Sequence, residues 1–288
     1  MSYATLTATV RVPATSANLG PGFDSLGLAL SLFDEVTARP SRRSTFVTVE
    51  GEGAGELPDG ESHLVASSMR AAFESCGAVA PPVRLHCRNA IPQARGLGSS
   101  SAAIVAGVCL ARRIMGDGAM TDDDALRVAS RIEGHPDNVA PCLLGGFVIA
   151  WTDADGARAV RREPASGLAP AVNVPQARGL TRQARAALPE LVPHADAVFN
   201  VARAALAVHA FTSDPSLLWE ATDDRLHQPY RAEAAPESFA LTRRLRAEGV
   251  PAMISGAGPS VLAFAEHPPP ADGFHVRTLR VCDGARTL

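Results

Sequence analysis

The sequence predicts an α+β fold, in which strands and helices are mixed without a regular strand–helix–strand repeat. Much of the first fifty residues has the alternation of strands, the middle of the chain carries several apolar stretches with the helical period, and the last forty residues return to short apolar runs. A doubly wound parallel sheet would need a repeating strand–helix unit, and the chain has none.

The expected strands are short runs of alternating or continuous apolar residues. They cover residues 5–12, 26–36, 45–49, 83–88, 145–151, 171–174, 252–255, 260–265 and 275–281. The segment from Pro13 to Asp24, between the first two strands, is dense in turn-forming residues, and we expect a loop there.

The expected helices have one apolar face and recognisable ends. They cover residues 62–76, 99–116, 121–133, 181–188, 195–211, 215–223 and 237–248. The helix after Thr121 has the clearest start, because Thr121 can cap it and three aspartates fill its first turn, where the helix dipole favours them. Gly134 and Pro136 are expected to end it.

The chain is long enough for one large or two medium domains. A connection rich in Pro, Gly and Ala runs over residues 163–170, and it predicts a division into residues 1–162 and residues 163–288.

Composition excludes several classes of function. The formal net charge of -3 and the scattered basic residues give no argument for a nucleic acid or an anionic membrane as partner, so we expect neither. All 27 basic residues are arginine, which excludes chemistry that depends on lysine, such as Schiff bases. Five cysteines without Cys-x-x-Cys spacing and the lack of a signal-peptide pattern predict a cytoplasmic protein.

The most informative stretch runs from Pro92 to Ser101 and opens an apolar helix. Its glycines and serines place free backbone N–H groups at the positive end of a helix dipole, where phosphate oxygens bind well. Ser99 stands where a Walker A loop has lysine, and Ser101 where a dinucleotide fingerprint has its third glycine. Phosphate binding here would therefore use main-chain amides, hydroxyls and a metal ion. The alternative is a turn that only caps the helix.

Two further segments carry polar or glycine-rich patterns. Residues 133–138 place four polar side chains at a helix end, and Glu133 with a serine of the glycine–serine loop could supply the hard oxygen ligands of a divalent metal. Residues 255–260 form a glycine-rich turn between two apolar strands. The glycines either allow a ligand to approach the backbone closely or serve only to form a tight β-turn.

The three glycine-rich segments, residues 12–30, 96–102 and 255–260, resemble in their order the three motifs of the GHMP kinases. Together with residues 133–147 and 225–231, the pattern looks like that of the homoserine kinases in this superfamily, and it spans essentially the whole chain. The resemblance implies an N-terminal domain like domain 2 of ribosomal protein S5 and a C-terminal ferredoxin-like α/β plait. It also implies transfer of the γ-phosphate of ATP to L-homoserine, a step towards threonine.

The resemblance also implies roles for individual residues. Asn18, Asn138, Ser100 and Glu133 match catalytic positions, and Ser100 and Glu133 among them match ligands of Mg²⁺. The positions that match the ATP site are Pro92, Arg95, Gly96, Leu97, Gly98, Ser99, Ser100, Ser101 and, in the adenine loop, His63. The positions that match the L-homoserine site are Asn18, Asp24, His135, Asn138, Thr181, Arg185, Arg231 and Gly258.

The residue chemistry agrees with an amino acid substrate, because Asp24 suits an ammonium group and two arginines, Arg185 and Arg231, suit a carboxylate. Without lysine, we expect direct in-line attack by the substrate hydroxyl. Other readings stay open at this point: a kinase of another small alcohol, such as mevalonate or an amino alcohol, or a non-catalytic nucleotide-binding relative. A serine hydrolase using Ser100 would lack the usual Gly-x-Ser-x-Gly spacing. The oligomeric state stays open between a monomer and a homodimer.

Overall fold

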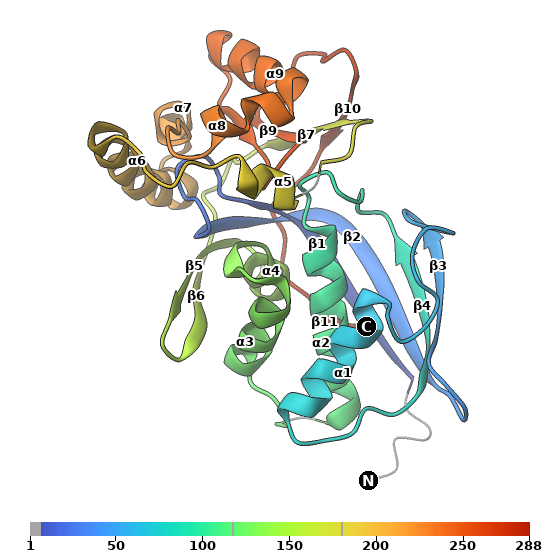
Figure 1. Ribbon diagram of the computed structural model, residues 1–288. Coiled ribbons are helices and arrows are strands. Elements are labelled where there is room, and N and C mark those ends of the chain that lie inside the picture. The colour runs from blue at the N-terminus through green and yellow to red at the C-terminus, as the bar shows by residue number, and fades with distance from the viewer. Residues whose placement is uncertain (1–6, 117, 180) are drawn as a thin grey trace.

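The computed structural model describes residues 7–116, 118–179 and 181–288, except for the side chain of Thr181. Two separate sheets are present and helices pack on both, so the predicted α+β class is confirmed (Figure 1). Among the described residues, no helix has the length and apolar character that crossing a membrane requires.

The first sheet has seven strands and forms the larger part of the molecule. Its members are β1 (Ala8–Ala17), β2 (Leu26–Pro40), β3 (Phe46–Gly51), β4 (Val83–Asn89), β5 (Phe147–Asp153), β6 (Gly156–Arg162) and β11 (Arg286–Thr287). The order is β11-β1-β2-β4-β3, with β5 paired to both β2 and β6. The β3–β4 pair is parallel, and the other pairs are antiparallel.

Four helices cover one face of this sheet (Figure 1). They are α1 (Leu64–Ser75), α2 (Ser99–Met115), α3 (Asp122–Glu133) and α4 (Pro136–Leu144). The predicted start of α3 is confirmed: Thr121 Oγ1 accepts a hydrogen bond of 3.1 Å from Asp124 N, and Thr121 N donates to Asp124 Oδ2 at 3.1 Å. Gly134 ends α3 with φ +92°. Pro136 follows the end of α3 and is also the first residue of α4, where a backbone N–H would have no partner within the helix.

The second sheet has four antiparallel strands in the order β10-β7-β9-β8. The strands are β7 (Pro170–Pro175), β8 (Ala252–Ile254), β9 (Val261–Phe264) and β10 (Phe274–Thr278). The helices gathered around it in Figure 1 are α5 (Thr181–Ala186), α6 (His194–Thr212), α7 (Leu218–Ala221), α8 (Gln228–Arg231) and α9 (Pro236–Ala247). Two short 3-10 helices, η1 (Pro215–Leu217) and η2 (Ala232–Ala234), precede α7 and follow α8.

The structure differs from the expected elements at several places. The strand β1 continues through Ala17 into the segment expected to be a loop, because its register with β2 shifts between Pro13 and Ala14 and pairing then resumes. The helices α4 and α8, the hairpin strand β6 and the short strand β11 were not expected. The predicted domain boundary falls between β6 and β7, which belong to different sheets. The division itself stays a prediction, since β11 returns to pair with β1.

A group of three aromatic rings packs where the two sheets approach each other. Phe211 of α6 is fully buried, and its ring centroid lies 5.3 Å from that of Phe147 in β5 and 5.4 Å from that of Phe264 in β9. One helix of the second half thus contacts a strand of each sheet, and these contacts stabilise the arrangement on which the site between the sheets depends.

Replacing Phe211→Ala should lower the free energy of unfolding by roughly 3–5 kcal/mol, the usual cost of removing a buried phenylalanine. Denaturant unfolding followed by circular dichroism measures the change. Val201→Ala is the matched control, because Val201 lies on the same helix with 72% of its surface exposed. A loss as small for Phe211→Ala as for the control would contradict this account of the aromatic group.

Candidate active site

The three glycine-rich segments, which lie far apart in the sequence, meet in the structure. Ser255 Oγ lies 2.8 Å from Ser16 Oγ and 2.6 Å from the carbonyl oxygen of Gly96. Gly256 N donates to the carbonyl of Ala17 at 3.1 Å. The end of β1, the loop before α2 and the turn between β8 and β9 therefore form one continuous backbone cluster.

Two glycines of the loop before α2 are required by close packing. A Cβ atom on Gly96 would lie 2.2 Å from the carbonyl oxygen of Ser255, and one on Gly98 would lie 2.0 Å from Thr15 Oγ1. Both glycines have positive φ, +72° and +69°, where other residues are strained. Any side chain here would push the loop away from its neighbours.

The N-terminus of α2 presents free main-chain amides beside this cluster. The first helical hydrogen bond runs from Ala102 N to Gly98 O, so the amides of Ser99, Ser100 and Ser101 come before it. No acidic side chain occupies the first turn of α2. The amides and the dipole of this 17-residue helix make its N-terminus suitable for an anion.

Glu133, at the end of α3, faces these serines. Its Oε1 accepts hydrogen bonds from Ser100 Oγ at 2.7 Å and from Ser101 Oγ at 3.0 Å. The two residues that the sequence suggested as metal ligands thus lie together, and a carboxylate with hydroxyls is a set of hard oxygen donors.

A cavity of about 240 Å³ opens at this place, and we call it the central cavity. It contains most of the residues singled out from the sequence: Asn18, Asp24, Arg95, Gly96, Gly98, Ser99, Ser100, Glu133, His135, Asn138, Arg185 and Arg231. Leu97 and Ser101 are buried behind it. Of the turn between β8 and β9, Gly256 and Ala257 line the central cavity, whereas Gly258 is not among its lining residues. The side chain of Thr181 lies outside the described part of the chain.

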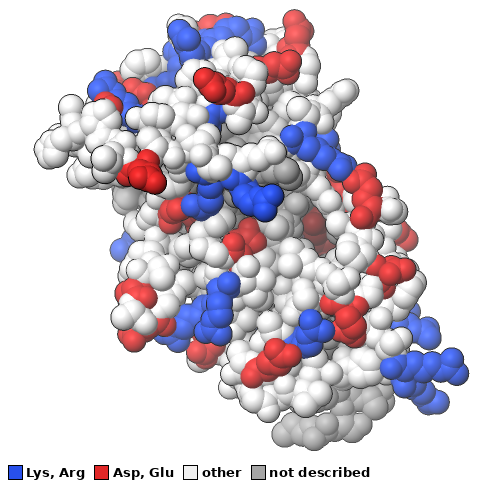
Figure 2. Space-filling model, viewed as in Figure 1, with Lys and Arg blue, Asp and Glu red and all other residues white. Residues whose placement is uncertain are grey.

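Opposite charges meet in the central cavity. Arg185 of α5 forms a bidentate ion pair with Asp24, with NH1–Oδ2 and NH2–Oδ1 distances of 2.9 and 2.6 Å. The hydrogen bond to Asp24 raises the pKa of Arg185 above its ordinary value, although burial opposes this. Figure 2 shows acidic and basic side chains close together across the middle of this face, between the helices of the second half and those of the first.

Asn18 and Arg231 both contact the turn between β8 and β9. Asn18 Nδ2 donates to Gly256 O at 2.8 Å, and Asn18 Oδ1 accepts from Asp24 N at 3.0 Å. Arg231 is only 5% exposed, and its NH1 lies 3.5 Å from the same Gly256 oxygen. Burial and the charge of Arg185 lower the pKa of Arg231.

Asp137 is a site residue that we did not single out from the sequence, although it lies within the 133–138 segment. It is 2% exposed, and its Oδ1 lies 2.5 Å from His135 Nδ1 and 3.4 Å from Asn138 Nδ2. Burial lowers the pKa of His135, but the hydrogen bond and charge of Asp137 outweigh it, so that the pKa of His135 is raised. The signal in the sequence was a second carboxylate two residues from a histidine.

A second cavity, of about 290 Å³, adjoins the serines of α2, and we call it the side cavity. It shares Ala94, Ser99 and Ser100 with the central cavity, and its lining is mostly apolar. His63, the predicted adenine-loop residue, lines it with Nδ1 capping α1 at Val65 N and with a buried Nε2 that has no partner among the described atoms. Asp34 also lines it, and burial raises the pKa of this carboxyl to about 6.

Arg95 ties the loop before α2 to the second sheet, and Pro92 is buried at the start of this loop. The guanidinium of Arg95 donates three hydrogen bonds to main-chain carbonyls, those of Pro175, Gln176 and Gln93, at 2.9–3.0 Å. Its donors thus hold the loop to the end of β7. Pro92 is buried beside Ile91, whose amide donates to Asp34.

Comparison with known proteins agrees with this geometry. Residues 63–146 match the GHMP kinases N terminal domain, and residues 202–275 match the GHMP kinases C terminal model. Homoserine kinase of Streptomyces avermitilis is 55% identical over 89% of this chain and 85% of its own length. Homoserine kinase of a Mycobacterium species (strain JLS) is 47% identical over 98% and 95%.

Among solved structures, homoserine kinase from Cytophaga hutchinsonii superposes with a TM-score of 0.86. It is 28% identical, and the match covers 98% of this chain and 97% of that one. The convergence of the three glycine-rich segments at one cavity, the two family-model matches and the identity over nearly the whole chain lead to one conclusion: this chain belongs to the homoserine kinase family of the GHMP kinases.

Proposed function

We propose that this chain transfers the γ-phosphate of ATP to the side-chain hydroxyl of L-homoserine, giving O-phospho-L-homoserine and ADP. One observation carries the proposal beyond family membership. Asp24, Arg185 and Arg231, the charges that fit a small zwitterion, line the same cavity as the N-terminus of α2. An acceptor bound by these charges would lie close to a phosphate bound by the amides, as phosphoryl transfer requires.

ATP would occupy both cavities. Its phosphates would lie on the amides between Gly96 and Ser101, which need no lysine to hold an anion. Its base would enter the side cavity beside His63, because that cavity is apolar and adjoins Ser99 and Ser100. Pro92, Arg95 and Leu97 would help to fix the conformation of this phosphate-binding loop.

Mg²⁺ fits the pair of Ser100 and Glu133. Magnesium ions in phosphoryl-transfer sites commonly take one or two protein oxygens and fill the other positions with phosphate oxygens and water. Glu133 Oε1 and Ser100 Oγ, 2.7 Å apart, are suitable donors beside the proposed phosphate position. When bound, the ion would neutralise charge on the phosphates.

L-homoserine would bind through its two charged groups. Asp24 would accept the ammonium group, while Arg185, Arg231 and His135 would hold the carboxylate. Asn18 and Asn138 would lie near the reacting hydroxyl, and both retain free hydrogen-bonding capacity after the bonds that they make to the protein. Thr181 and Gly258 remain proposed contacts of the substrate by resemblance alone.

We propose in-line attack without a dedicated protein base. The chain has no lysine. The three carboxylates that line the central cavity already have partners within the described residues: Asp24 has Arg185, Glu133 has Ser100 and Ser101, and Asp137 has His135. A carboxylate held by a hydrogen bond donor is a weaker base. Positioning and charge neutralisation then supply the catalysis, and the hydroxyl proton leaves late, to the phosphate.

The proposal also places the chain in the cytoplasm, where ATP is available and where its five free cysteines would stay reduced.

The direct test is ADP release measured with L-homoserine, D-homoserine, mevalonate, L-threonine and L-serine, with and without Mg²⁺. We expect L-homoserine to have by far the highest kcat/KM and the activity to need the metal. Mevalonate has no ammonium group for Asp24, so a preference for mevalonate would overturn the substrate assignment. ADP release independent of every alcohol would overturn phosphoryl transfer to an amino alcohol.

Glu133→Ala should lower kcat at saturating Mg²⁺ and ATP by about 10²-fold or more, as expected when several kcal/mol of charge stabilisation are lost. Steady-state kinetics across a Mg²⁺ titration measures the change. Glu163→Ala, which removes an exposed carboxylate paired with Arg161, is the control and should leave kcat unchanged. Near-normal turnover of Glu133→Ala would mean that Glu133 is no metal ligand.

Asp24→Asn should raise the KM for L-homoserine by about 10- to 100-fold, because a charge-assisted hydrogen bond to the ammonium group is lost. The KM for ATP should stay near its wild-type value. Glu56→Gln is the matched control, since it breaks another bidentate carboxylate–arginine pair, with the exposed Arg178. If Asp24→Asn instead abolished turnover at an unchanged KM and removed a carboxylate from the pH–rate profile, Asp24 would be the base that this mechanism lacks.

A further inference from the structure

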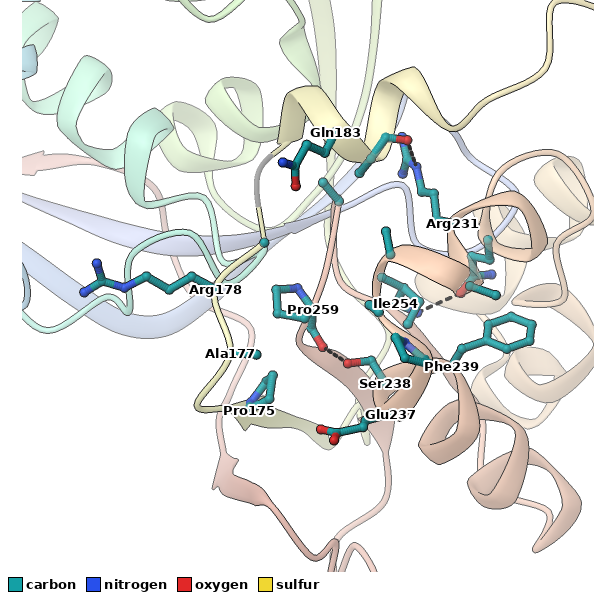
Figure 3. Close-up of a pocket in the computed structure, with 18 residues that line it drawn as sticks. Pro175, Ala177, Arg178, Gln183, Arg231, Glu237, Ser238, Phe239, Ile254 and Pro259 are labelled. Atoms are coloured by element: carbon teal, nitrogen blue, oxygen red, sulfur yellow. Dashed lines mark hydrogen bonds between the residues drawn. The ribbon is translucent and has the colours of Figure 1, made fainter.

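Arg231 is a buried cation whose orientation depends on hydrogen bonds. A cavity of about 290 Å³ lies beside it, lined in part by Arg231, Ala257 and Pro259, so side-chain packing does not surround the residue (Figure 3). Its Nε donates to Ala184 O at 3.1 Å, which fixes one edge of the guanidinium. The other edge lies near two acceptors. NH1 is 3.5 Å from the carbonyl oxygen of Gly256 and 3.3 Å from His227 Nδ1.

His227 is completely buried, and its ring bridges Arg231 to the loop after β1. His227 Nε2 lies 2.7 Å from the carbonyl oxygen of Gly20, and His227 Nδ1 lies 3.3 Å from Arg231 NH1. A carbonyl only accepts hydrogen bonds, so Nε2 carries the hydrogen. The other group near Nε2, Asp224 Oδ2 at 3.5 Å, is also an acceptor. Arg231 only donates, so Nδ1 must be the unprotonated nitrogen.

The surroundings keep the ring neutral and fixed in place. Burial lowers the pKa of His227; the negative charge of Asp224 opposes this, and the positive charge of Arg231 acts in the same direction as burial, so the pKa is lowered overall. Asp224 Oδ2 accepts from the backbone amides of His227 and Gln228 at 3.2 and 2.8 Å, which anchors the start of α8. Phe23 stacks on the ring at 5.1 Å between centroids, and the Phe23 ring also lies 5.1 Å from the guanidinium carbon of Arg231.

We infer that His227 is a positioning residue of the kinase: its neutral Nε2–H tautomer accepts a hydrogen bond from Arg231 and turns the guanidinium towards the carboxylate of the substrate. The inference rests on the proposed function for the identity of that carboxylate. Gly20, His227 and Arg231 then form one chain of hydrogen bonds. This chain couples the loop that holds Asp24 to the arginine at the other end of the substrate.

Two substitutions distinguish the role of Nδ1 from that of Nε2. His227→Asn places an amide oxygen near the position of Nδ1, so it keeps an acceptor for Arg231 and gives up the bond to Gly20. His227→Gln places an amide nitrogen near the position of Nε2, so it keeps the donor for Gly20 and gives up the acceptor for Arg231. We expect His227→Gln to raise the KM for L-homoserine by about tenfold or more, the effect of losing one hydrogen bond to a charged group. His227→Asn should raise it far less, and neither should change the KM for ATP.

A double-mutant cycle then tests whether His227 acts through Arg231. Arg231→Leu alone should raise the KM for L-homoserine more than His227→Gln does, and adding His227→Gln to it should have no further effect. Equal effects of the Asn and Gln variants, a parallel rise in the KM for ATP, or additive effects in the double mutant would each make His227 a structural residue only.

The tautomer can be measured without any substitution, which keeps the inference testable if the Gln variant does not fold. In the ¹⁵N-labelled wild-type protein, NMR of the histidine rings should show His227 as the neutral Nε2–H tautomer. An imidazolium or an Nδ1–H tautomer would overturn the inference. This readout is independent of catalysis, whereas failure of the proposed function would appear as wild-type protein that releases no ADP with L-homoserine.

Discussion

The site depends on one contact of backbone against backbone, where the loop before α2 meets the turn between β8 and β9. Gly96 packs so closely on Ser255 that a Cβ atom would lie 2.2 Å from its carbonyl oxygen. Ser16, at the end of β1, joins the same cluster through Ser255. The contact brings the main-chain amides of α2 against a turn of the second sheet, and the central cavity lies at this junction. A loop with side chains in these places could not bring the free amides of α2 so close to the residues of the second half.

Charge balance is the second constraint on this site. Asp24 and Arg185 neutralise each other across the central cavity, and a zwitterion can replace both halves of that interaction, ammonium for guanidinium and carboxylate for carboxylate. A ligand with one charge can replace only one half and leaves the other ion without its partner, which is costly in a partly buried site. The ion pair therefore favours amino acids over simple hydroxy acids before any contact with the hydroxyl group is considered.

A buried arginine must also be supported. Arg231 is 5% exposed, and burial disfavours its charge, so the hydrogen bonds from its guanidinium to Ala184, Gly256 and His227 offset part of that cost. The same bonds limit how the guanidinium can turn beside the neighbouring cavity. A substrate carboxylate would then meet a preorganised cation, and less conformational entropy would be lost on binding.

The sequence by itself determined the local features of this protein. Thr121 and Gly134 mark the ends of α3 because capping depends on residues next to each other, and the glycine–serine loop predicts an anion site because free amides at a helix start are a local property. The motif residues that line the central cavity could be named because the glycine-rich segments and the segments around them resemble those of the homoserine kinases. Only the tertiary structure decided that Gly256 and Ala257 rather than Gly258 line the cavity, and that His227 bridges Gly20 to Arg231. These contacts join residues far apart in the chain, such as Gly20 and His227, which are 207 positions apart, and residue patterns do not encode which distant groups will meet. The packing of the two sheets and their helices determines which distant groups meet.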